Sequence, residues 1–503
     1  MARVRAHRTV WVAHRPGRCT RDHLRTLSSI DRASLDLDGI SAFHHTGWTL
    51  DVDTGRVELS YSLDDRWHFT EVVELGQPAP SSPAERTALH GALHLLWLVS
   101  GVSYYKVAAP PQVRVPYQLR PAERKLLDAV YGPGLAEYRW TNRLDQDTVP
   151  EIIDFGPVAP GSGAVGSAGP VLVPVGGGKD SIVSIDLLTR AGHDVVLFAV
   201  NDHAAIESTI ATAGLPAVRV RRRLDPLLFR LNEQGARNGH VPVTAIVSML
   251  AVAVAVQHGC PAVAMSNERS ASDPTVEIDG VSVNHQYSKS LEFEHVLAAA
   301  IASAVAPSLE YFSLLRPWSE LAIMRRFAEL QRFHPVFTSC NRAFAVLEGN
   351  RSPSWCGDCD KCRFVFLAMA PSVTRATLVA VVGRDLLADP AQLEGFRALL
   401  GLVGTKPFEC VGEVDECRWA LARLAASPDW ADAPVVTALA GELRRAGGAI
   451  PPVNDAVVLD PSGEHRVPER YLGAAMALDP DLTPTAGSPG PRTPPGSSPD
   501  HRG

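Results

Sequence analysis

Two patterns of apolar and polar positions follow one another along the chain, and the second predicts a parallel sheet. Before about residue 155 the pattern is mixed, with a hairpin predicted around the turn Asp53-Thr54-Gly55 and a helix beginning after Ser82. Later, short apolar runs alternate with helical segments; the runs lie at residues 171–175, 195–200, 218–220 and 262–265. Helices are predicted from Asp180, from His203 and over residues 243–256. Such alternation is typical of βαβ units, which form a parallel sheet covered by helices.

The same patterns, read with local composition, predict the domain organisation. Residues 157–170 consist almost entirely of Gly, Ser, Ala, Val and Pro, as linkers often do. We therefore expect an α+β domain at residues 1–156 and an α/β domain with a doubly wound parallel sheet at residues 171–372. Helices are expected at residues 373–479. The basic first 25 residues are expected to be flexible, and the Pro- and Gly-rich residues 480–503 to be disordered.

Overall composition narrows the class of function. Among 503 residues, 46% are hydrophobic and 20% charged, as in an ordinary globular protein, and the net charge is −7. Nucleic-acid binders usually carry a basic surface, so we expect small molecules as partners and no nucleic acid. The longest apolar run, residues 243–256, is shorter than the roughly 20 residues that cross a bilayer. Eight cysteines without a recognisable export signal indicate reduced thiols, so we expect a cytoplasmic protein.

A glycine-rich loop follows the first strand of the second pattern and carries the most informative chemistry. It reads Gly176-Gly177-Gly178-Lys179-Asp180-Ser181 and precedes a helix. Glycines let backbone N–H groups approach an anion, the helix N-terminus adds a positive dipole end, and Lys179 adds a full charge. The loop is neither a P-loop nor a GxGxxG motif. The alternative is a plain glycine turn with an incidental lysine.

This loop resembles the pyrophosphate-binding loop Ser-Gly-Gly-x-Asp-Ser of the N-type ATP pyrophosphatases, with Gly176 in place of the usual serine. The resemblance implies an ATP pyrophosphatase fold. It also implies that residues 176–181 hold the β and γ phosphates of ATP while a nucleophile attacks the α phosphorus. Magnesium normally screens the leaving pyrophosphate in such reactions, so we expect Mg²⁺ as a cofactor.

Four cysteines form a pattern typical of a metal site. They are Cys340, Cys356, Cys359 and Cys362. Four thiolates make a closed tetrahedral zinc site with no position for water, so we expect a structural Zn²⁺. Free cysteines and an iron–sulfur cluster are the alternatives. Similar cysteines follow the ATP domain of 7-cyano-7-deazaguanine synthases. The other cysteines, Cys19, Cys260, Cys410 and Cys417, are expected to be packing residues.

Two polar segments, residues 266–272 and 284–290, are candidates for the rest of the site. The first follows a predicted strand, and ligands of open α/β sheets bind beyond the carboxyl ends of strands. Glu268 or His285 is a candidate proton acceptor, and Arg269 or Lys289 a candidate for holding an anionic substrate group. Solvated loop charges are the alternative. Together with Lys179 and Asp180, these four are the expected catalytic residues.

Taken together, these segments resemble one family, the UDP-N-acetylmuramoyl-L-alanyl-L-glutamate epimerases of peptidoglycan precursor synthesis. The similar segments are residues 104–106, 176–181, 266–272, 284–290 and 355–366. The resemblance implies conversion of the terminal L-glutamate of a nucleotide-linked dipeptide to D-glutamate. It implies ATP and Mg²⁺ as requirements and AMP and pyrophosphate as products. Residues 103–106 are considered either as a segment that closes over the site or as an edge strand.

Two other functions stay open. One is another enzyme of the same ATP class, such as a 7-cyano-7-deazaguanine synthase or a tRNA-modifying thiolase; the acidic charge disfavours the latter. The other is a zinc-stapled nucleotide-binding regulator without catalytic turnover, which the missing serine at Gly176 favours. The sequence does not predict the identity of the base or the oligomeric state.

Overall fold

The computed structural model describes most of the chain. The described residues are 10–12, 37, 39–159, 161–278, 280–344, 351–404, 406–445 and 455–479. Nearly all of the predicted flexible start, and the whole predicted disordered tail, lie outside these ranges. Within them, no helix combines the length and apolar character that a membrane span requires.

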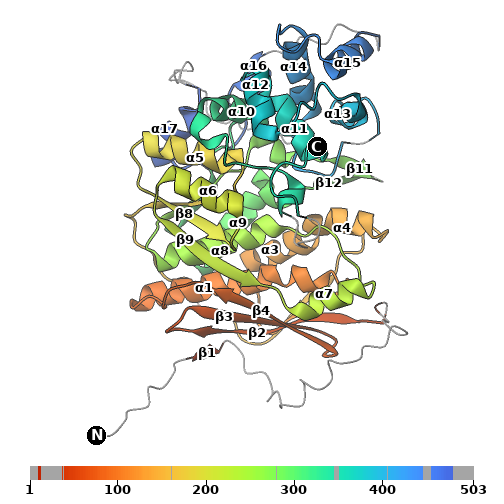
Figure 1. The fold of residues 1–503 in the computed structure, drawn as a ribbon. Coiled ribbons are helices and arrows are strands. Elements are labelled where there is room, and N and C mark those ends of the chain that lie inside the picture. The colour runs from red at the N-terminus through yellow and green to blue at the C-terminus, as the bar shows by residue number, and fades with distance from the viewer. Residues whose placement is uncertain are drawn as a thin grey trace, which may run out of the picture.

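One mixed sheet extends from the middle of the described structure to one end of it (Figure 1). Its order is β13-β10-β7-β8-β9-β4-β3-β2-β5-β6, with β1 paired to β2. The strands are β1 (Val10–Val12), β2 (Ala42–Asp51), β3 (Arg56–Leu63), β4 (Trp67–Glu74), β5 (Gln112–Val115), β6 (Glu151–Asp154), β7 (Val171–Pro174), β8 (Val195–Val200), β9 (Ala217–Arg223), β10 (Ala262–Met265) and β13 (Glu310–Ser313). β13, β10, β7, β8 and β9 are mutually parallel, whereas β9, β4, β3 and β2 pair in antiparallel fashion. The predicted α/β class with a parallel sheet is therefore confirmed.

Most of the predicted elements begin and end within a few residues of their expected positions. β2 and β3 form the predicted hairpin, and Gly55 takes the left-handed conformation (φ +69°) that its turn requires. The helix α1 starts at Pro83, after Ser82. The Ser82 side chain makes no capping hydrogen bond to the start of the helix. Here Pro83 and the packing of the helix, rather than a serine cap, define its start.

Helices lie on both faces of the parallel part of the sheet and give two hydrophobic cores. One core contains side chains of α1 (Pro83–Ser100), α3 (Pro121–Tyr131), α7 (Pro226–Glu233), α8 (Val243–Gln257) and α9 (Leu291–Ala304). The other contains those of α5 (Lys179–Arg190), α6 (Ala204–Ala213), α10 (Glu320–Glu329) and α17 (Glu469–Met476). Successive β7 side chains alternate between them: Leu172 lies in the first core, Val171 and Val173 in the second. This is the period of two that a strand imposes.

The second core continues into helices at the end of the molecule opposite β2–β4 (Figure 1). These helices are α11 (Asp360–Met369), α12 (Arg375–Val382), α13 (Leu393–Leu399), α14 (Val414–Ala425), α15 (Pro434–Arg445) and α16 (Asp455–Leu459). The short elements are α2 (Val102–Tyr105), α4 (Ala136–Thr141), the β11 (Val276–Ile278) and β12 (Val281–Val283) hairpin, and several 3₁₀ turns. Residues 373–479 are thus helical wherever they are described with regular structure.

The amino-terminal strands and the parallel strands belong to one sheet, because β4 pairs with β9. The helix α1 also packs against α8 in a shared core. The division into independent domains, with a linker at residues 157–170, stays a prediction. Residues 103–106 form neither a closing segment nor an edge strand: residues 103–105 lie in α2, and Tyr104 and Tyr105 are buried.

Candidate active site

A cavity of about 400 Å³ opens at the carboxyl ends of the parallel strands. Pro174, Val200 and Met265, the last residues of β7, β8 and β10, all line it. The strand order reverses here, since the chain runs from β7 through β8 to β9 and then crosses back to β10 on the other side of β7. Ligands of open α/β sheets bind at such switch points. The volume is within the ~300–1,000 Å³ range of small-molecule pockets.

The glycine loop forms one wall of this cavity. Gly177 has φ +76°, and a Cβ atom there would lie 3.1 Å from the Ala205 side chain. A Cβ on Gly178 would lie 3.0 Å from Ser339 Oγ, whereas one on Gly176 would have no atom within 4 Å. A side chain at Gly176 would therefore extend into open space, whereas Gly177 and Gly178 are packed tightly. The first N–H groups of a helix have no partner within the helix, and Gly178, the residue before α5, has no side chain to cap them, so they can donate to an anion.

Lys179 does not line the cavity. Its ammonium is buried and forms ion pairs with Asp180 and with Glu320 of α10. Burial alone would lower the pKa of Lys179, but the two carboxylates outweigh it and raise the pKa. The lysine charge thus faces the protein interior, and the predicted contact between Lys179 and phosphate stays a prediction.

Three polar side chains near the loop do line the cavity. Asp180 is partly exposed to it, and Ser181 Oγ donates to the Gly178 carbonyl at 3.3 Å. Ser266, which follows β10, shares a 2.7 Å hydrogen bond between its Oγ and that of Ser184. The helix α5 and the loop after β10 are therefore connected by this hydrogen bond.

The two charged residues after β10 point in different directions. Glu268 is buried and lines the cavity, and burial, followed by the nearby Glu320 carboxylate, raises its pKa to about 7. Arg269 instead donates to the Asp460 carbonyl at 3.3 Å and to the Ser462 hydroxyl. The structure brings Glu268 to the cavity but not Arg269, whose predicted binding of a substrate anion stays a prediction.

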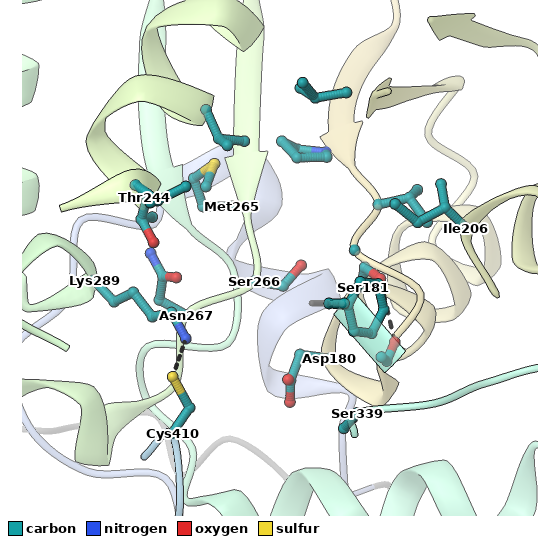
Figure 2. A pocket seen from close by; sticks show the side chains of 18 of the residues that line it. Asp180, Ser181, Ile206, Thr244, Met265, Ser266, Asn267, Lys289, Ser339 and Cys410 are labelled. Carbon is teal, nitrogen blue, oxygen red and sulfur yellow. Dashed lines mark hydrogen bonds between the residues drawn. The ribbon is translucent and has the colours of Figure 1, made fainter. Parts of the chain in front are cut away.

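Lys289 and His285 also differ in position. Lys289 lines the cavity, and its Nζ donates to Cys410 Sγ at 3.1 Å (Figure 2). The same Nζ also donates to Gln286 Oε1 at 3.1 Å. Burial would lower the pKa of Lys289, but Cys410 and Glu268 raise it. His285 lies behind this wall, where its Nδ1 is 2.5 Å from Glu137 Oε2. Figure 2 shows Lys289 and Cys410 on one side of the cavity and Ser181 and Ser339 on the other.

Several lining residues were not found from the sequence. Apolar side chains suited to a flat aromatic base are Phe198, Val200, Ile206, Val243, Val247 and Met265. Cys410, expected to be a packing residue, lines the cavity as well. No spacing pattern marks Cys410, because it lies 121 positions after Lys289. Lys361 was not predicted as a site residue, because it lies between two cysteines of the metal motif. It nevertheless lines the cavity and donates to the Cys410 carbonyl.

The four cysteines predicted from their spacing do lie together. All four Sγ atoms are within 4.8 Å of one another, with 4.0 Å from Cys340 to Cys359, 3.8 Å from Cys356 to Cys362 and 3.4 Å from Cys359 to Cys362. Sulfurs bonded to zinc at ~2.3 Å would be about 3.8 Å apart in a tetrahedron, whereas a disulfide needs about 2.05 Å. The cluster therefore fits a metal ion, and its donor set suits zinc.

The cluster also borders the cavity. Thr338 and Ser339, just before Cys340, line it, as does Lys361 between Cys359 and Cys362. The Thr338 N–H donates to the Gly177 carbonyl at 3.0 Å. A metal that joins Cys340 to the start of α11 would thus hold the wall that contacts the glycine loop.

Comparison with known proteins gives matches that cover most of the chain. The model of the MurL N-terminal domain matches residues 34–314, and that of the MurL C-terminal domain matches residues 336–449. The chain is 47% identical to a Micromonospora protein over 86% of this chain and 98% of the relative. It is 46% identical to one from Salinispora tropica (87% and 96%) and 40% identical to one from Xanthomonas oryzae pv. oryzae (87% and 97%). All three relatives are named UDP-N-acetyl-alpha-D-muramoyl-L-alanyl-L-glutamate epimerase.

Proposed function

The chain belongs to the MurL family, and we therefore propose that it is an epimerase that converts the terminal L-glutamate of UDP-N-acetyl-α-D-muramoyl-L-alanyl-L-glutamate to D-glutamate. We further propose that the enzyme first transfers AMP from ATP to the glutamate carboxylate and releases pyrophosphate. Epimerisation and hydrolysis then give the D product and AMP. The reaction supplies a peptidoglycan precursor and takes place in the cytoplasm, where ATP is available.

Activation by ATP has a simple physical reason. Removing the α proton beside a free carboxylate would place a second negative charge on the same group, which is prohibitively costly. Transfer of AMP neutralises the carboxylate, so that the α carbon becomes acidic enough for a side-chain base of moderate pKa. Because the glutamate is N-acylated, closure to an oxazolone is a second route to an acidic α carbon. Both routes need the same activated carboxyl group.

The observation that carries this proposal is the position of the glycine loop at the switch point of the sheet. Gly176 leaves room for an anion, and the amides at the start of α5, which have no partner within the helix, are suitable donors for phosphate oxygens. The apolar wall that includes Phe198 and Met265 suits the adenine base. The absence of a serine hydroxyl at Gly176 removes one contact to phosphate but none of these backbone donors.

Two metal ions fit residues of the chain. Asp180 lines the cavity beside the loop, and its carboxylate is the kind of hard oxygen ligand that Mg²⁺ prefers. A bound Mg²⁺ would screen the charge of the departing pyrophosphate. Cys340, Cys356, Cys359 and Cys362 would hold Zn²⁺ in a closed site, where its contribution is to folding rather than to the reaction.

The direct test supplies ATP, Mg²⁺ and the L,L-dipeptide nucleotide in deuterated water. We expect AMP and pyrophosphate in equal amounts, D-glutamate by chiral analysis after hydrolysis, and deuterium at the glutamate α carbon. Formation of D-glutamate without AMP would contradict the proposed adenylation step. The absence of D-glutamate would contradict the epimerase function itself.

A panel of muramoyl and deazapurine substrates separates this function from the alternatives. A 7-cyano-7-deazaguanine synthase-like enzyme would release pyrophosphate only with the deazapurine. A regulator without turnover would bind ATP and release nothing with any substrate.

A further inference from the structure

A thiol lies in the cavity wall across from the glycine loop. Cys410 Sγ accepts a hydrogen bond from the Lys289 ammonium at 3.1 Å, and both side chains line the cavity (Figure 2). The backbone carbonyl of Cys410 is held by Lys361, which also lines the cavity. This thiol is therefore fixed at a surface that a ligand would touch, unlike Cys260 and Cys417, which are buried outside the cavity.

Behind the thiol stand an imidazole and a carboxylate in series. The His285 imidazole lies close enough to Cys410 for each group to shift the pKa of the other, and its Nδ1 lies 2.5 Å from Glu137 Oε2. Glu137 comes from α4, His285 from the loop after β12 and Cys410 from the loop before α14. Three distant segments thus meet to form a thiol–imidazole–carboxylate series. In such a series the carboxylate orients the imidazole, and the imidazole accepts or returns a proton of the thiol.

The charges around Cys410 favour its thiolate. Burial alone would raise its pKa, but Lys289, His285 and Lys361 outweigh burial and lower the pKa to about 6. Glu409, its neighbour in the chain, has a pKa raised to about 7, first by burial, and so opposes the thiolate only weakly near neutral pH. In contrast, burial raises the pKa of Cys260 to about 11. A thiolate ready to accept a proton at neutral pH exists at Cys410 because cations converge there.

We propose that Cys410 is a catalytic residue that accepts the α proton of the activated glutamate, with His285 and Glu137 as its positioning residues. The assignment rests on the proposed function above. The α C–H bond breaks, an S–H bond forms on Cys410, and the electron pair moves into the carbonyl group of the activated carboxyl. Glu268, also on the cavity wall, returns a proton to the opposite face of the planar carbon.

The position of Lys289 supports Cys410 and Glu268 as the two residues that accept and return the proton. Its ammonium is bonded to Cys410, and the charge of Glu268 also acts on it. A fixed cation between them stabilises whichever carrier is ionised, and it stabilises the negative charge that develops on the activated glutamate. Lys289 itself stays protonated, because its pKa is raised. It is therefore an electrostatic partner and not the base.

The test compares Cys410→Ser with the wild type in deuterated water. We expect pyrophosphate release to persist, because the glycine loop is untouched. Deuterium entry at the glutamate α carbon and formation of D-glutamate should both fall by roughly 10²–10⁴-fold, the usual contribution of a positioned acid–base group. Cys260→Ala removes a buried thiol outside the cavity and should keep both rates.

Each outcome has one meaning. If the wild type releases no pyrophosphate, the proposed function fails before Cys410 is tested. If Cys410→Ser keeps deuterium exchange, or loses pyrophosphate release to the same degree as exchange, the proton-transfer role of Cys410 is overturned. A mass increase on Cys410 that corresponds to the dipeptide nucleotide would overturn it as well, since the thiol would then be a nucleophile.

A second readout follows the thiolate without any substrate. Peptide mapping after brief iodoacetamide treatment should show that alkylation of Cys410 in the wild type rises with a midpoint near pH 6. In His285→Gln this midpoint should move upward, toward the ordinary thiol value of about 8.5. A merely structural role for His285 would leave the midpoint unchanged. A wild-type midpoint already near the ordinary value would overturn the proposal.

Discussion

Breaking the buried ion pair between Lys179 and Glu320 should strongly destabilise the site region, because it leaves a buried charge without its partner. Both side chains are almost completely buried, with 1% and 2% of their surface exposed. Glu320→Gln keeps the size of the side chain but removes its charge. Lys179 would then be a buried ammonium that keeps its ion pair with Asp180 but loses the one with Glu320. Burial alone would raise the pKa of Glu320, but Lys179 and Lys361 outweigh it and lower the pKa to about 2.

Removing one member of a buried pair usually costs about 3–5 kcal/mol, because the remaining charge is left without compensation. Since Asp180 still pairs with Lys179, we expect the lower end, a loss of about 3 kcal/mol in the free energy of unfolding. Urea unfolding followed by tryptophan fluorescence measures it, and the buried Trp318 just before α10 reports on this region. The folded pKa of Glu320 lies below its unfolded value of 4.5. The stabilisation is therefore present above pH 4.5 and is lost as the pH falls toward 2.

The matched control is Glu329→Gln in the same helix. Glu329 pairs with Arg326, but 59% of its side chain is exposed, so its loss should cost no more than about 0.5 kcal/mol. In a Lys179→Met/Glu320→Leu double variant, which replaces the pair by apolar side chains, most of the lost stability should return. Equal losses in Glu320→Gln and Glu329→Gln would refute the interpretation of the buried pair.

Three further predictions concern the loop, the cysteines and the histidine. Gly176→Ala places a methyl group in the open space of the loop, so the KM for ATP should rise at least about tenfold, the equivalent of one lost hydrogen bond to phosphate. Cys356→Ser should lower the zinc content, measured by mass spectrometry, from one ion per chain and should destabilise the fold. The pKa of His285 is raised to about 9 despite burial, because Cys410 and Glu137 bind its protonated form. The stability that Glu137 provides, measured as the difference in unfolding free energy from Glu137→Gln, should be present below pH 6.5 and lost as the pH rises through 9.

Each of these has a result that would contradict it. Gly473→Ala, on the exposed face of α17, is the control for the loop variant, and an equal rise in KM would remove the loop from ATP binding. Zinc content unchanged in Cys356→Ser would place the metal elsewhere. A constant difference between wild type and Glu137→Gln from pH 6 to 10 would mean that the carboxylate does not hold a protonated imidazole.

The sequence predicted the regular elements well because their signals are local. The strands β7, β8, β9 and β10 each arise from a short apolar run, and α5 and α6 begin close to their expected first residues. Hairpin β2–β3 follows from a turn with glycine at a left-handed position. The pairing of β4 with β9, which joins the two halves of the sheet, has no such signal. It depends on contacts between segments about 150 residues apart.

The position of the candidate site along the backbone was predictable from the sequence, whereas the directions of its side chains were less so. The glycine loop and the cluster of four cysteines lie where spacing indicated. Arg269 and Lys179 carry the expected charges, yet one is bonded to the carboxyl-terminal region and the other to Glu320. The residue type determines the charge of a side chain but not its direction, which depends on the partners that the folded chain brings near it.

The sequence alone predicted a parallel sheet, a glycine loop between a strand and a helix, and four cysteines spaced for one metal, and the structure contains all three features. The signals for these properties are short local patterns, namely apolar runs, the glycine loop and the spacing of Cys356, Cys359 and Cys362, on which steric limits and hydrogen bonds act directly. Only the tertiary structure decided that Cys410 meets Lys289 and His285, and that Lys179 faces the interior. Such contacts depend on how helices and loops from distant segments pack. The free energy of burial is a property of the whole core, so no single segment determines these contacts.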